Sequence, residues 1–347
     1  LMAGQLERRG IIWTDDEDTA DIVIFNTCSI RDLAERKVMG KIGLLREKGA
    51  HTIIGVTGCM ANSKKEHLLE AFPYLDFVLG PNNIHNLNDV IDDVLAKKER
   101  FVCADENFVH ELDYLAARRA DPVKASVSII RGCNNFCTYC IVPHVRGREA
   151  SRPPESIKEE CIHLVDKGYK EITLLGQNVN SYGNDKPDWG YRFHDLLSDL
   201  DAIPGFDRIR FMTSHPVDIT RELMEALRDL PSLCEFVHFP LQAGSDRVLK
   251  KMHRKYDIKH YMEKVAMLRE IVPNVSLGTD IIVGFPTETD EEFEETYNLM
   301  KEIEYAVAFI FAYSPRKGTP AARWDDDVPK EVKKERLHRL LALHDEI

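Results

Sequence analysis

The stretch "IIRGCNNFCTYCIVPHVRG", residues 129–147, determines how the rest of the chain is interpreted. Its cysteines Cys133, Cys137 and Cys140 stand in C-x3-C-x2-C spacing, directly after a run of β-branched residues. Thiolates are soft ligands that select zinc, copper(I) and iron–sulfur clusters. Three of them within eight residues therefore indicate a metal centre, although no fourth cysteine stands beside them.

Two kinds of metal centre are compatible with this spacing. A structural zinc ion takes four ligands, and His144 could complete a Cys3His site in a non-catalytic, zinc-stabilised binding module. A [4Fe–4S] cluster usually has four Cys ligands. Three would leave one iron open to bind a substrate. The cysteine pattern by itself leaves both interpretations open.

Composition and length indicate an ordinary globular protein of two or three domains, with 347 residues, 44% hydrophobic and 30% charged. No apolar run is long enough to span a membrane, and no secretory signal pattern is visible. Eight cysteines in such a chain favour a reducing compartment, so we expect a cytoplasmic protein. The net charge of −12 argues against a basic surface over the whole molecule, but it permits a local basic track.

Alternating strand and helix patterns predict two α/β domains. Residues 1–96 carry short β-rich runs at 11–14, 21–27, 52–58 and 76–80, with a helix at 30–48 that begins after Ser29 and stops at Gly49. This rhythm predicts a small, doubly wound parallel sheet. Residues 97–123 are charged and lack a clean period, and we interpret them as a linker.

The second domain, residues 124–347, contains six strand candidates, each followed by a helical stretch. The strands are expected at 125–131, 171–176, 208–213, 235–240, 275–285 and 306–313. Thr289 followed by Glu292 forms a capping box at the start of one helix. Six such repeats predict a (β/α)6 partial barrel, whose active face is formed by the loops at the carboxyl ends of the strands.

A C-x3-C-x2-C loop after the first strand of such a barrel resembles that of the radical S-adenosylmethionine (SAM) enzymes. The resemblance implies a partial TIM barrel of the radical SAM type, with a [4Fe–4S] cluster held by Cys133, Cys137 and Cys140. It also implies that the open iron binds the amino and carboxylate groups of SAM. The reduced cluster would then cleave SAM into methionine and a 5′-deoxyadenosyl radical that removes hydrogen from a strong C–H bond.

Cys28 and Cys59 follow the strands expected at 21–27 and 52–58. In a parallel sheet both positions lie at the carboxyl edge, where open α/β sheets bind ligands, so the two thiols could meet at one metal. The alternative is two small buried residues at strand ends. A doubly wound domain normally begins with a strand, whereas this chain opens on a helical stretch. We therefore expect a third cysteine just upstream of Leu1, which with Cys28 and Cys59 would hold a second [4Fe–4S] cluster.

A more detailed resemblance runs along nearly the whole chain. It is carried by "ADIVIFNTCSIRDLAERKV" (20–38), "GVTGCMAN" (55–62), "LLGQNVNSYG" (174–183), "TSHP" (213–216), "FPLQAGSDRVLKKMHRKY" (239–256) and "TDIIVGFPTET" (279–289). In this order the segments resemble the methylthiotransferases, a radical SAM subfamily. Two family features are absent from this sequence, namely an N-terminal strand with its cysteine and a C-terminal RNA-binding β-barrel.

Within that subfamily the segments are most similar to the tRNA branch that makes 2-methylthio-isopentenyladenosine. This similarity implies that a methylthio group is added to carbon 2 of isopentenyl-adenosine, beside the anticodon of tRNA. One SAM would supply the methyl group, and a second the radical. The sister branches act on threonylcarbamoyl-adenosine in tRNA or on an aspartate of a ribosomal protein. The expected partners are the tRNA anticodon loop, a reducing protein such as a flavodoxin or ferredoxin, and a sulfur donor.

Several polar residues near the later strand ends are expected to contact SAM. The segment Gly176–Asn178 stands where related enzymes bind the SAM amino group. The full set of expected cofactor-binding residues is Gly176, Gln177, Asn178, Ser214, Gln242, Ser245, Arg254 and Asp280. Each has an alternative role in a turn, a helix cap, the surface or, for Asp280, as a buried polar partner.

Two basic groups are expected to track RNA phosphates, since both stand in loops at the carboxyl edge of the predicted barrel. They are Arg146, Arg148 and Arg152, and Lys250, Lys251, Arg254 and Lys255. The alternative is a solvated basic face. His215 is interpreted as a residue of the catalytic face or as a hydrogen-bonded loop residue, and we favour the second role. Cys161 and Cys234 are interpreted as core residues.

Overall fold

The computed structural model describes residues 1–29, 32–44, 52–97, 99–104 and 114–347. The chain divides into two compact units. Unit 1 comprises residues 1–120 together with 141–147, and unit 2 comprises residues 121–140 and 148–347. The return of residues 141–147 to unit 1 is not visible in the sequence pattern. It means that the chain passes from one unit to the other at 120/121, 140/141 and 147/148.

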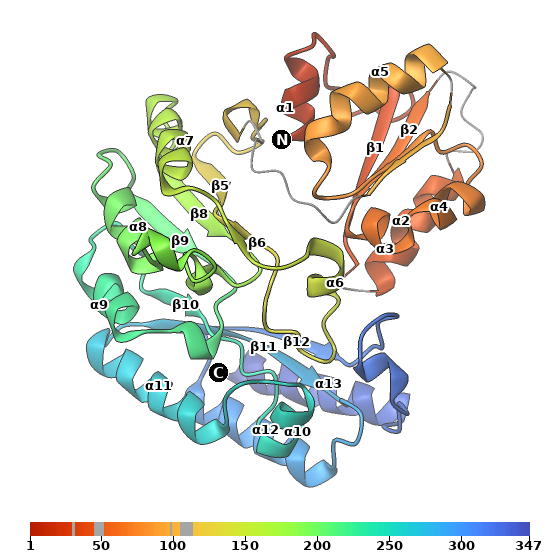
Figure 1. Cartoon of the computed structure of the whole chain (residues 1–347). Coiled ribbons are helices and arrows are strands. Elements are labelled where there is room, and N and C mark those ends of the chain that lie inside the picture. The colour runs from red at the N-terminus through yellow and green to blue at the C-terminus, as the bar shows by residue number, and fades with distance from the viewer. Residues whose placement is uncertain (30–31, 45–51, 98, 105–113) are drawn as a thin grey trace. The chain divides into compact units, whose positions relative to one another are not determined.

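Unit 1 is built on a four-stranded parallel sheet in the order β1-β2-β3-β4 (Figure 1). The strands are β1 (Ile22–Thr27), β2 (Ile53–Gly58), β3 (Phe77–Leu79) and β4 (Phe101–Cys103). The helices are α1 (Met2–Glu7), α2 (Asp32–Leu44), α3 (Cys59–Lys64), α4 (Glu66–Ala71), α5 (Leu87–Lys97) and α6 (Val142–Arg146), with 3-10 turns η2 (Ile84–Asn86) and η3 (Tyr114–Ala116).

Alternation along the strands gives this sheet two buried faces. Ile54 and Val56 of β2 pack with residues of α2, α3 and α4, whereas Ile53 packs with residues of α1 and α5. Successive side chains of a strand point to opposite faces, so a strand buried on both sides is apolar throughout. Helices therefore lie on both faces of the sheet, as the predicted doubly wound domain requires (Figure 1).

Two predictions for unit 1 were wrong. Residues 11–14 are not a strand, and Ile12 is 88% exposed, because no neighbouring strand pairs with this run in the described part of the chain. Part of the expected linker 97–123 is structural, since Phe101–Cys103 forms β4 at the sheet edge. Residues 105–113 lie outside the described residues, as do the expected helix start at 30–31 and end at 45–49.

Unit 2 contains six parallel strands in two hydrogen-bonded groups, β5-β8-β9 and β10-β11-β12. A parallel bridge between Ile209 and Leu233 joins β9 to the segment that leads into β10. The strands are β5 (Lys124–Ser128), β8 (Glu171–Leu175), β9 (Arg208–Phe211), β10 (Phe236–His238), β11 (Ser276–Val283) and β12 (Val307–Ala312). Each of the six overlaps a predicted strand, and the predicted partial barrel is confirmed.

Helices cover the outer side of this curved sheet (Figure 1). They are α7 (Pro154–Asp166), α8 (Phe193–Asp201), α9 (Arg221–Asp229), α10 (Asp246–Lys251), α11 (Ile258–Ile271), α12 (Asp290–Ile303) and α13 (Lys330–Glu346). The 3-10 turns are η4 (Val179–Ser181), η5 (Pro187–Trp189), η6 (Pro216–Asp218) and η7 (Ala321–Arg323). One apolar core runs through the unit from Ala125 to Leu343.

The first expected strand of this unit, 125–131, is split in two. The strand is interrupted at Ile129, and β6 (Ile130–Arg131) pairs antiparallel with β7 (Ala150–Ser151). This small hairpin holds the cysteine loop between its two strands in the sequence. The loop is therefore anchored at both of its ends by strand pairing.

Candidate active site

Cys133, Cys137 and Cys140 lie on the loop that follows β6, and the loop has a well-defined backbone. Phe136 between the first two cysteines has a left-handed backbone (φ 48°), and the amide of Cys140 donates to the carbonyl of Cys137 at 2.9 Å. Cys137 is buried, whereas Cys133 and Cys140 are half-buried. The turn places three thiols on one short, ordered segment.

Neighbouring elements hold this loop in place. The Thr138 amide donates to the carbonyl of Met252 at 3.1 Å, and its hydroxyl donates to the carbonyl of Lys251 at 2.8 Å. On the other side, the Gly132 amide donates to Oε1 of Gln177 at 2.6 Å. Gln177, expected to contact SAM, thus uses its carbonyl oxygen to tie the cysteine loop to the end of β8.

Nitrogen donors approach two of the cysteine sulfurs in unit 2. Nη1 of Arg254 donates to Sγ of Cys137 at 3.3 Å, and Nδ2 of Asn135 lies 3.6 Å from Sγ of Cys133. Burial raises the pKa of the Cys133 thiol above its ordinary value, and the nearby Glu149 carboxylate adds to the rise. A ligand that binds there as a thiolate must release a proton, so metal binding is coupled to pH.

Three thiols on one short loop are a soft donor set of the kind that binds iron–sulfur clusters. In a [4Fe–4S] cluster each thiolate binds a different iron, so three thiolates leave one iron for another ligand. The chemistry of the donor set therefore fits an iron–sulfur cluster.

Three of the expected SAM contacts carry buried polar atoms that lack a partner. Asn178, Ser214 and Gln242 are each less than 10% exposed. Oδ1 of Asn178, Oγ of Ser214 and Oε1 of Gln242 make no hydrogen bond to any described residue. Such atoms are costly to bury unless a ligand satisfies them. They lie after β8, β9 and β10, so they fit a polar cofactor bound along this edge of the sheet.

The other expected contacts already have partners in the protein. The hydroxyl of Ser245 donates to Oε1 of Glu292 at 3.0 Å, and Oδ1 of Asp280 lies 3.4 Å from Nε2 of His238. Gly176 brings the backbone close to the hairpin, because a Cβ there would lie 2.4 Å from Cγ2 of Ile130. These residues shape the site without presenting an unsatisfied atom.

Two carboxylates at this edge were missed in the sequence. Glu149 accepts hydrogen bonds from the backbone and side-chain amides of Asn134 at 3.3 and 3.2 Å, and Asp218 accepts from Nδ2 of Asn178 at 2.7 Å. Burial raises the pKa of both carboxyls, and the negative charge of Asp218 raises that of Glu149 further. A cationic group that bound beside them would offset this cost. Glu149, which directly precedes β7, and Asp218, which ends η6, belong to no distinctive sequence pattern.

His215 is buried beside the same loops. Its Nδ1 accepts a hydrogen bond from the Val217 amide at 3.3 Å, and its backbone is held on both sides by the amide side chain of Asn180. Burial lowers the pKa of His215 to about 2, and the positive charges of Arg254 and Lys255 add to the effect. The imidazole is therefore neutral near pH 7 and is hydrogen-bonded within the loop through Nδ1, while its buried Nε2 has no hydrogen-bond partner among the described residues.

Cys28 and Cys59 of unit 1 follow neighbouring strands in register. β1 and β2 pair in parallel, with Thr27 opposite Gly58, so the next residue of each strand is a cysteine at the same carboxyl edge. Gly58 has φ +89°, and a Cβ there would lie 2.3 Å from the Thr27 carbonyl oxygen. The two strand ends approach closely at that point, where Cys28 is exposed and Cys59 is buried.

Helix α6 packs beside Cys59 within unit 1. Ile141 and Val145 form a buried apolar cluster with Cys59, and Nδ2 of Asn62 donates to the carbonyl of Val145 at 2.9 Å. The same packing places Nε of Arg146 at 3.4 Å from Sγ of Cys59. Arg146, expected to contact RNA phosphate, is therefore held at a candidate metal ligand.

Two further residues of the expected basic track are bonded inside unit 2. Arg152 is 4% exposed and forms a buried ion pair with Glu160, and Nζ of Lys251 donates to Oγ1 of Thr287 at 2.6 Å. The expectation that Arg152 contacts phosphate was wrong, because its charge is already neutralised. Arg148, Lys250 and Lys255 are exposed.

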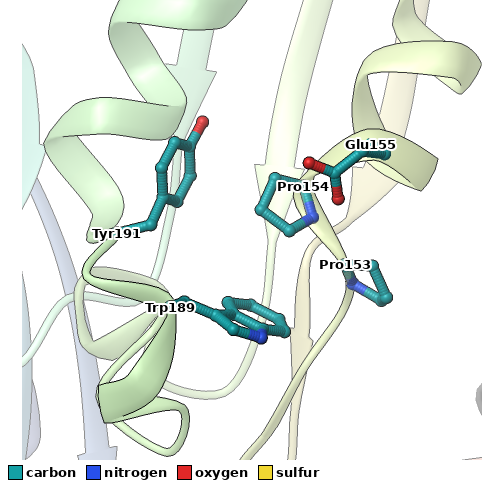
Figure 2. A pocket seen from close by; sticks show the side chains of 5 residues that line it. All are labelled: Pro153, Pro154, Glu155, Trp189 and Tyr191. Atoms are coloured by element: carbon teal, nitrogen blue, oxygen red, sulfur yellow. The ribbon is translucent and has the colours of Figure 1, made fainter.

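A separate cavity of about 350 Å³ lies at the start of α7 (Figure 2). It is lined by Pro153, Pro154, Glu155, Trp189 and Tyr191, and includes none of the predicted site residues. The hydroxyl of Tyr191 is engaged with Asp199 at 2.8 Å. The cavity is mainly apolar and aromatic, unlike the polar edge that carries the cysteine loop.

Comparison with known families covers both units. Residues 127–300 match the Radical SAM superfamily, and residues 1–80 match an uncharacterised protein family, UPF0004. A relative from Protochlamydia amoebophila (strain UWE25), tRNA-2-methylthio-N(6)-dimethylallyladenosine synthase, is 69% identical over 348 residues, covering 100% of this chain and 77% of the relative. This chain belongs to the family of tRNA-2-methylthio-N(6)-dimethylallyladenosine synthases. A second relative with the same name comes from Clostridium botulinum (strain Loch Maree / Type A3). It is 47% identical over 352 residues, covering 100% of this chain and 78% of the relative.

Solved structures share the fold of this synthase family member. The radical SAM methyltransferase TsrM from Kitasatospora setae, solved with cobalamin and a [4Fe–4S] cluster, aligns with a TM-score of 0.66 at 15% identity. The alignment covers 91% of this chain and 67% of TsrM. The cobalamin-dependent radical SAM enzyme OxsB aligns with a TM-score of 0.58 at 13% identity, over 100% of this chain and 50% of OxsB. At such low identity these similarities establish the fold alone.

Proposed function

We propose that this chain is a radical SAM methylthiotransferase that adds a methylthio group to carbon 2 of isopentenyl-adenosine next to the anticodon of tRNA. The observation that carries the proposal is 69% identity along the full chain to a synthase of that name. The cysteine loop and the unsatisfied polar atoms beside it support the same conclusion, because they match the needs of a cluster and a polar cofactor. The enzyme is a transferase that uses [4Fe–4S] clusters and SAM.

Cys133, Cys137 and Cys140 would hold the first cluster. When bound, the cluster and SAM supply the radical chemistry that an unactivated aromatic C–H bond requires. The protein's own contribution is to hold the loop by Thr138 and Gln177. The sequence places no fourth cysteine beside the three. Three thiolates leave one iron available to SAM.

The polar groups of SAM have matching partners along the edge of the sheet. Its amino group is a cation, and the half-buried carboxylates of Glu149 and Asp218 and the buried Oδ1 of Asn178 are acceptors of the kind that such a cation needs. The hydroxyl of Ser214 and the amide of Gln242 are available for the ribose or the carboxylate. These residues would bind and orient SAM, while the apolar core behind them excludes water.

Cys28 and Cys59 would provide two ligands of the second cluster. Their placement after paired strands supports this assignment, because Thr27 and Gly58 stand opposite each other in the sheet. The second cluster is where the sulfur to be transferred would be carried. The chain's residues there position the ligands, with Arg146 donating to the Cys59 sulfur.

Transfer RNA is the macromolecular substrate in this proposal. Arg148, Lys250 and Lys255 are exposed and flank the cysteine loop and α10, so they are the candidates for phosphate contacts. A target base would leave its stack to reach the site, at a cost of a few kcal/mol. We further propose a reducing partner such as a flavodoxin or ferredoxin, a sulfur donor, and action in the cytoplasm. No described helix is long and apolar enough to cross a membrane.

Nucleoside analysis of tRNA from a strain lacking the gene tests this function. We expect loss of the methylthio group from isopentenyl-adenosine and its return when the gene is restored. Restoration with a Cys133→Ala variant should fail, whereas Cys234→Ala should succeed. An intact methylthio-isopentenyl-adenosine in the deletion strain would contradict the proposal. Loss of the mark from threonylcarbamoyl-adenosine, or from a ribosomal-protein aspartate, would instead assign the enzyme to a sister branch.

A further inference from the structure

The guanidinium of Arg254 is fixed against Cys137 by a second residue. Its Nη1 donates to the Cys137 sulfur at 3.3 Å, and its Nε donates to the hydroxyl of Tyr256 at 3.0 Å. The guanidinium carbon also lies 5.0 Å from the centre of the Tyr256 ring. The hydroxyl of Tyr256 is buried and is itself bonded to the carbonyls of Pro240 and Leu241. The position of the positive charge at the sulfur is therefore imposed by the fold.

A permanent positive charge at a ligand sulfur has an electrostatic consequence for a cluster. Arginine stays protonated, and its N–H groups form charge-assisted hydrogen bonds with anionic acceptors. Hydrogen bonds to the sulfurs, net charge and exposure set the reduction potential of an iron–sulfur cluster. Reduction adds a negative charge, so a cation at the ligand sulfur stabilises the reduced form more than the oxidised form.

We propose that Arg254 is a positioning residue that raises the reduction potential of the cluster at Cys133, Cys137 and Cys140, acting through the sulfur of Cys137. This inference rests on the proposed function, since it requires that cluster. It makes the one-electron reduction that precedes SAM cleavage easier for a weak physiological reductant. The Nε–Sγ contact of 3.4 Å between Arg146 and Cys59 in unit 1 repeats the same chemistry at the other cysteine site.

The expected role of Arg254 as a SAM contact makes a different prediction. If the guanidinium served only the SAM carboxylate or ribose, its removal would weaken SAM binding and leave the potential of the SAM-free cluster unchanged. If it acts on the sulfur, the potential changes without SAM. Measuring the cluster before SAM is added therefore separates the two roles.

The experiment uses anaerobically reconstituted protein in a Cys28→Ala/Cys59→Ala background, so that one cluster is observed. Redox titration followed by electron paramagnetic resonance gives the midpoint potential without SAM. In Arg254→Gln we expect the ratio of reduced to oxidised cluster at the wild-type midpoint to be about tenfold lower, which corresponds to a midpoint about 59 mV more negative for one electron. Arg254→Lys should fall between the two, because an ammonium keeps the charge but lacks the planar fork.

Arg148→Gln is the matched control. Arg148 is exposed and lies over the ring of Phe136 in the same loop, with 4.5 Å between the guanidinium carbon and the ring centre. Removing its charge should leave the midpoint unchanged, because solvent screens it and it makes no contact with sulfur in the described structure. An equal shift in Arg148→Gln would contradict a specific role for Arg254.

Further outcomes separate a failure of this inference from a failure of the proposed function. A wild-type midpoint in an iron-replete Arg254→Gln variant would overturn the inference and leave the proposed function standing. If Arg254→Gln binds no iron, the midpoint of Arg254→Met, which also lacks the charge, decides instead, and a wild-type value there would again overturn the inference. If the background protein with Arg254 intact holds no cluster, the proposed function itself fails.

Discussion

The residues at the edge of the barrel lower the stability of the protein so that a ligand can be bound. A buried polar atom without a partner costs about 1–3 kcal/mol. Asn178, Ser214 and Gln242 each carry one, at the ends of three successive strands. Glu149 and Asp218 add half-buried carboxyls whose pKa values are raised. Binding of a cationic, polar cofactor would recover much of this free energy, so SAM should stabilise the fold markedly.

His215 gives a pH-dependent prediction at the same scale. Its folded-state pKa of about 2 lies below the value of about 6.5 for an exposed histidine, because burial excludes the proton. Between these values the unfolded chain binds more protons, so the stability falls as the pH drops below about 6.5. His215→Gln should make the slope shallower by up to about 1.4 kcal/mol per pH unit at pH 4.5–5.5.

Urea unfolding from pH 7 to 4.5 measures this slope. His67→Gln is the control, because the His67 side chain is 85% exposed and its removal should leave the slope unchanged. Equal slopes for wild type and His215→Gln would show that the imidazole is not excluded from protonation in the native state.

For individual residues, the sequence predicted which side chains lie at the site better than it predicted which residues they contact. The cysteines, Asn178, Ser214 and Gln242 could be selected because each follows a predicted strand end. The bonds of Gln177 to Gly132, of Ser245 to Glu292 and of Arg254 to Cys137 could not, since they join segments that are distant in sequence. Glu149 and Asp218 escaped notice for the same reason.

The start of helix α12 tests whether the capping box predicted from the sequence stabilises the protein. Oγ1 of Thr289 accepts from the Glu292 amide at 3.3 Å, and Oε2 of Glu292 accepts from the Thr289 amide at 2.9 Å. Thr289→Ala should cost about 1 kcal/mol of stability, because the first turn loses a partner for a backbone N–H. Thr289→Ser keeps the hydroxyl and should cost little. Urea midpoints of both variants measure the effect, and equal losses would show that the cap contributes nothing.

Sequence patterns located most helices and strands and missed or misassigned a few. The strands of unit 2 were predicted because each carries continuous or alternating apolar residues between helical stretches. β4 was missed because it has three residues within a charged stretch, and residues 11–14 were misassigned because β-branched composition does not supply a neighbouring strand. The membership of α6 in unit 1 depends on its packing against α3, which no local pattern encodes.

For the molecule as a whole, the two cysteine sets belong to different units of the chain. Cys28→Ala should therefore abolish methylthio transfer to tRNA while SAM cleavage continues, because the loop at Cys133–Cys140 keeps its own anchors. Release of 5′-deoxyadenosine and mass spectrometry of tRNA nucleosides measure the two steps separately.

Cys234→Ala is the control for that experiment, because this half-buried cysteine belongs to neither set, and both steps should persist. Loss of SAM cleavage in Cys28→Ala, or continued methylthio transfer, would contradict the division of labour between the units.

The passage of residues 141–147 into unit 1 makes the two units inseparable as fragments. A cut at 120/121 leaves α6 on the second fragment, where Ile141 and Val145 lose the surface of α3 that buries them. The first fragment in turn uncovers Cys59 and leaves Asn62 without the Val145 carbonyl. We expect each fragment from a gene split at that point to aggregate, because it exposes apolar residues that are buried in the intact chain. Coexpression of both fragments would be needed to recover a stable product.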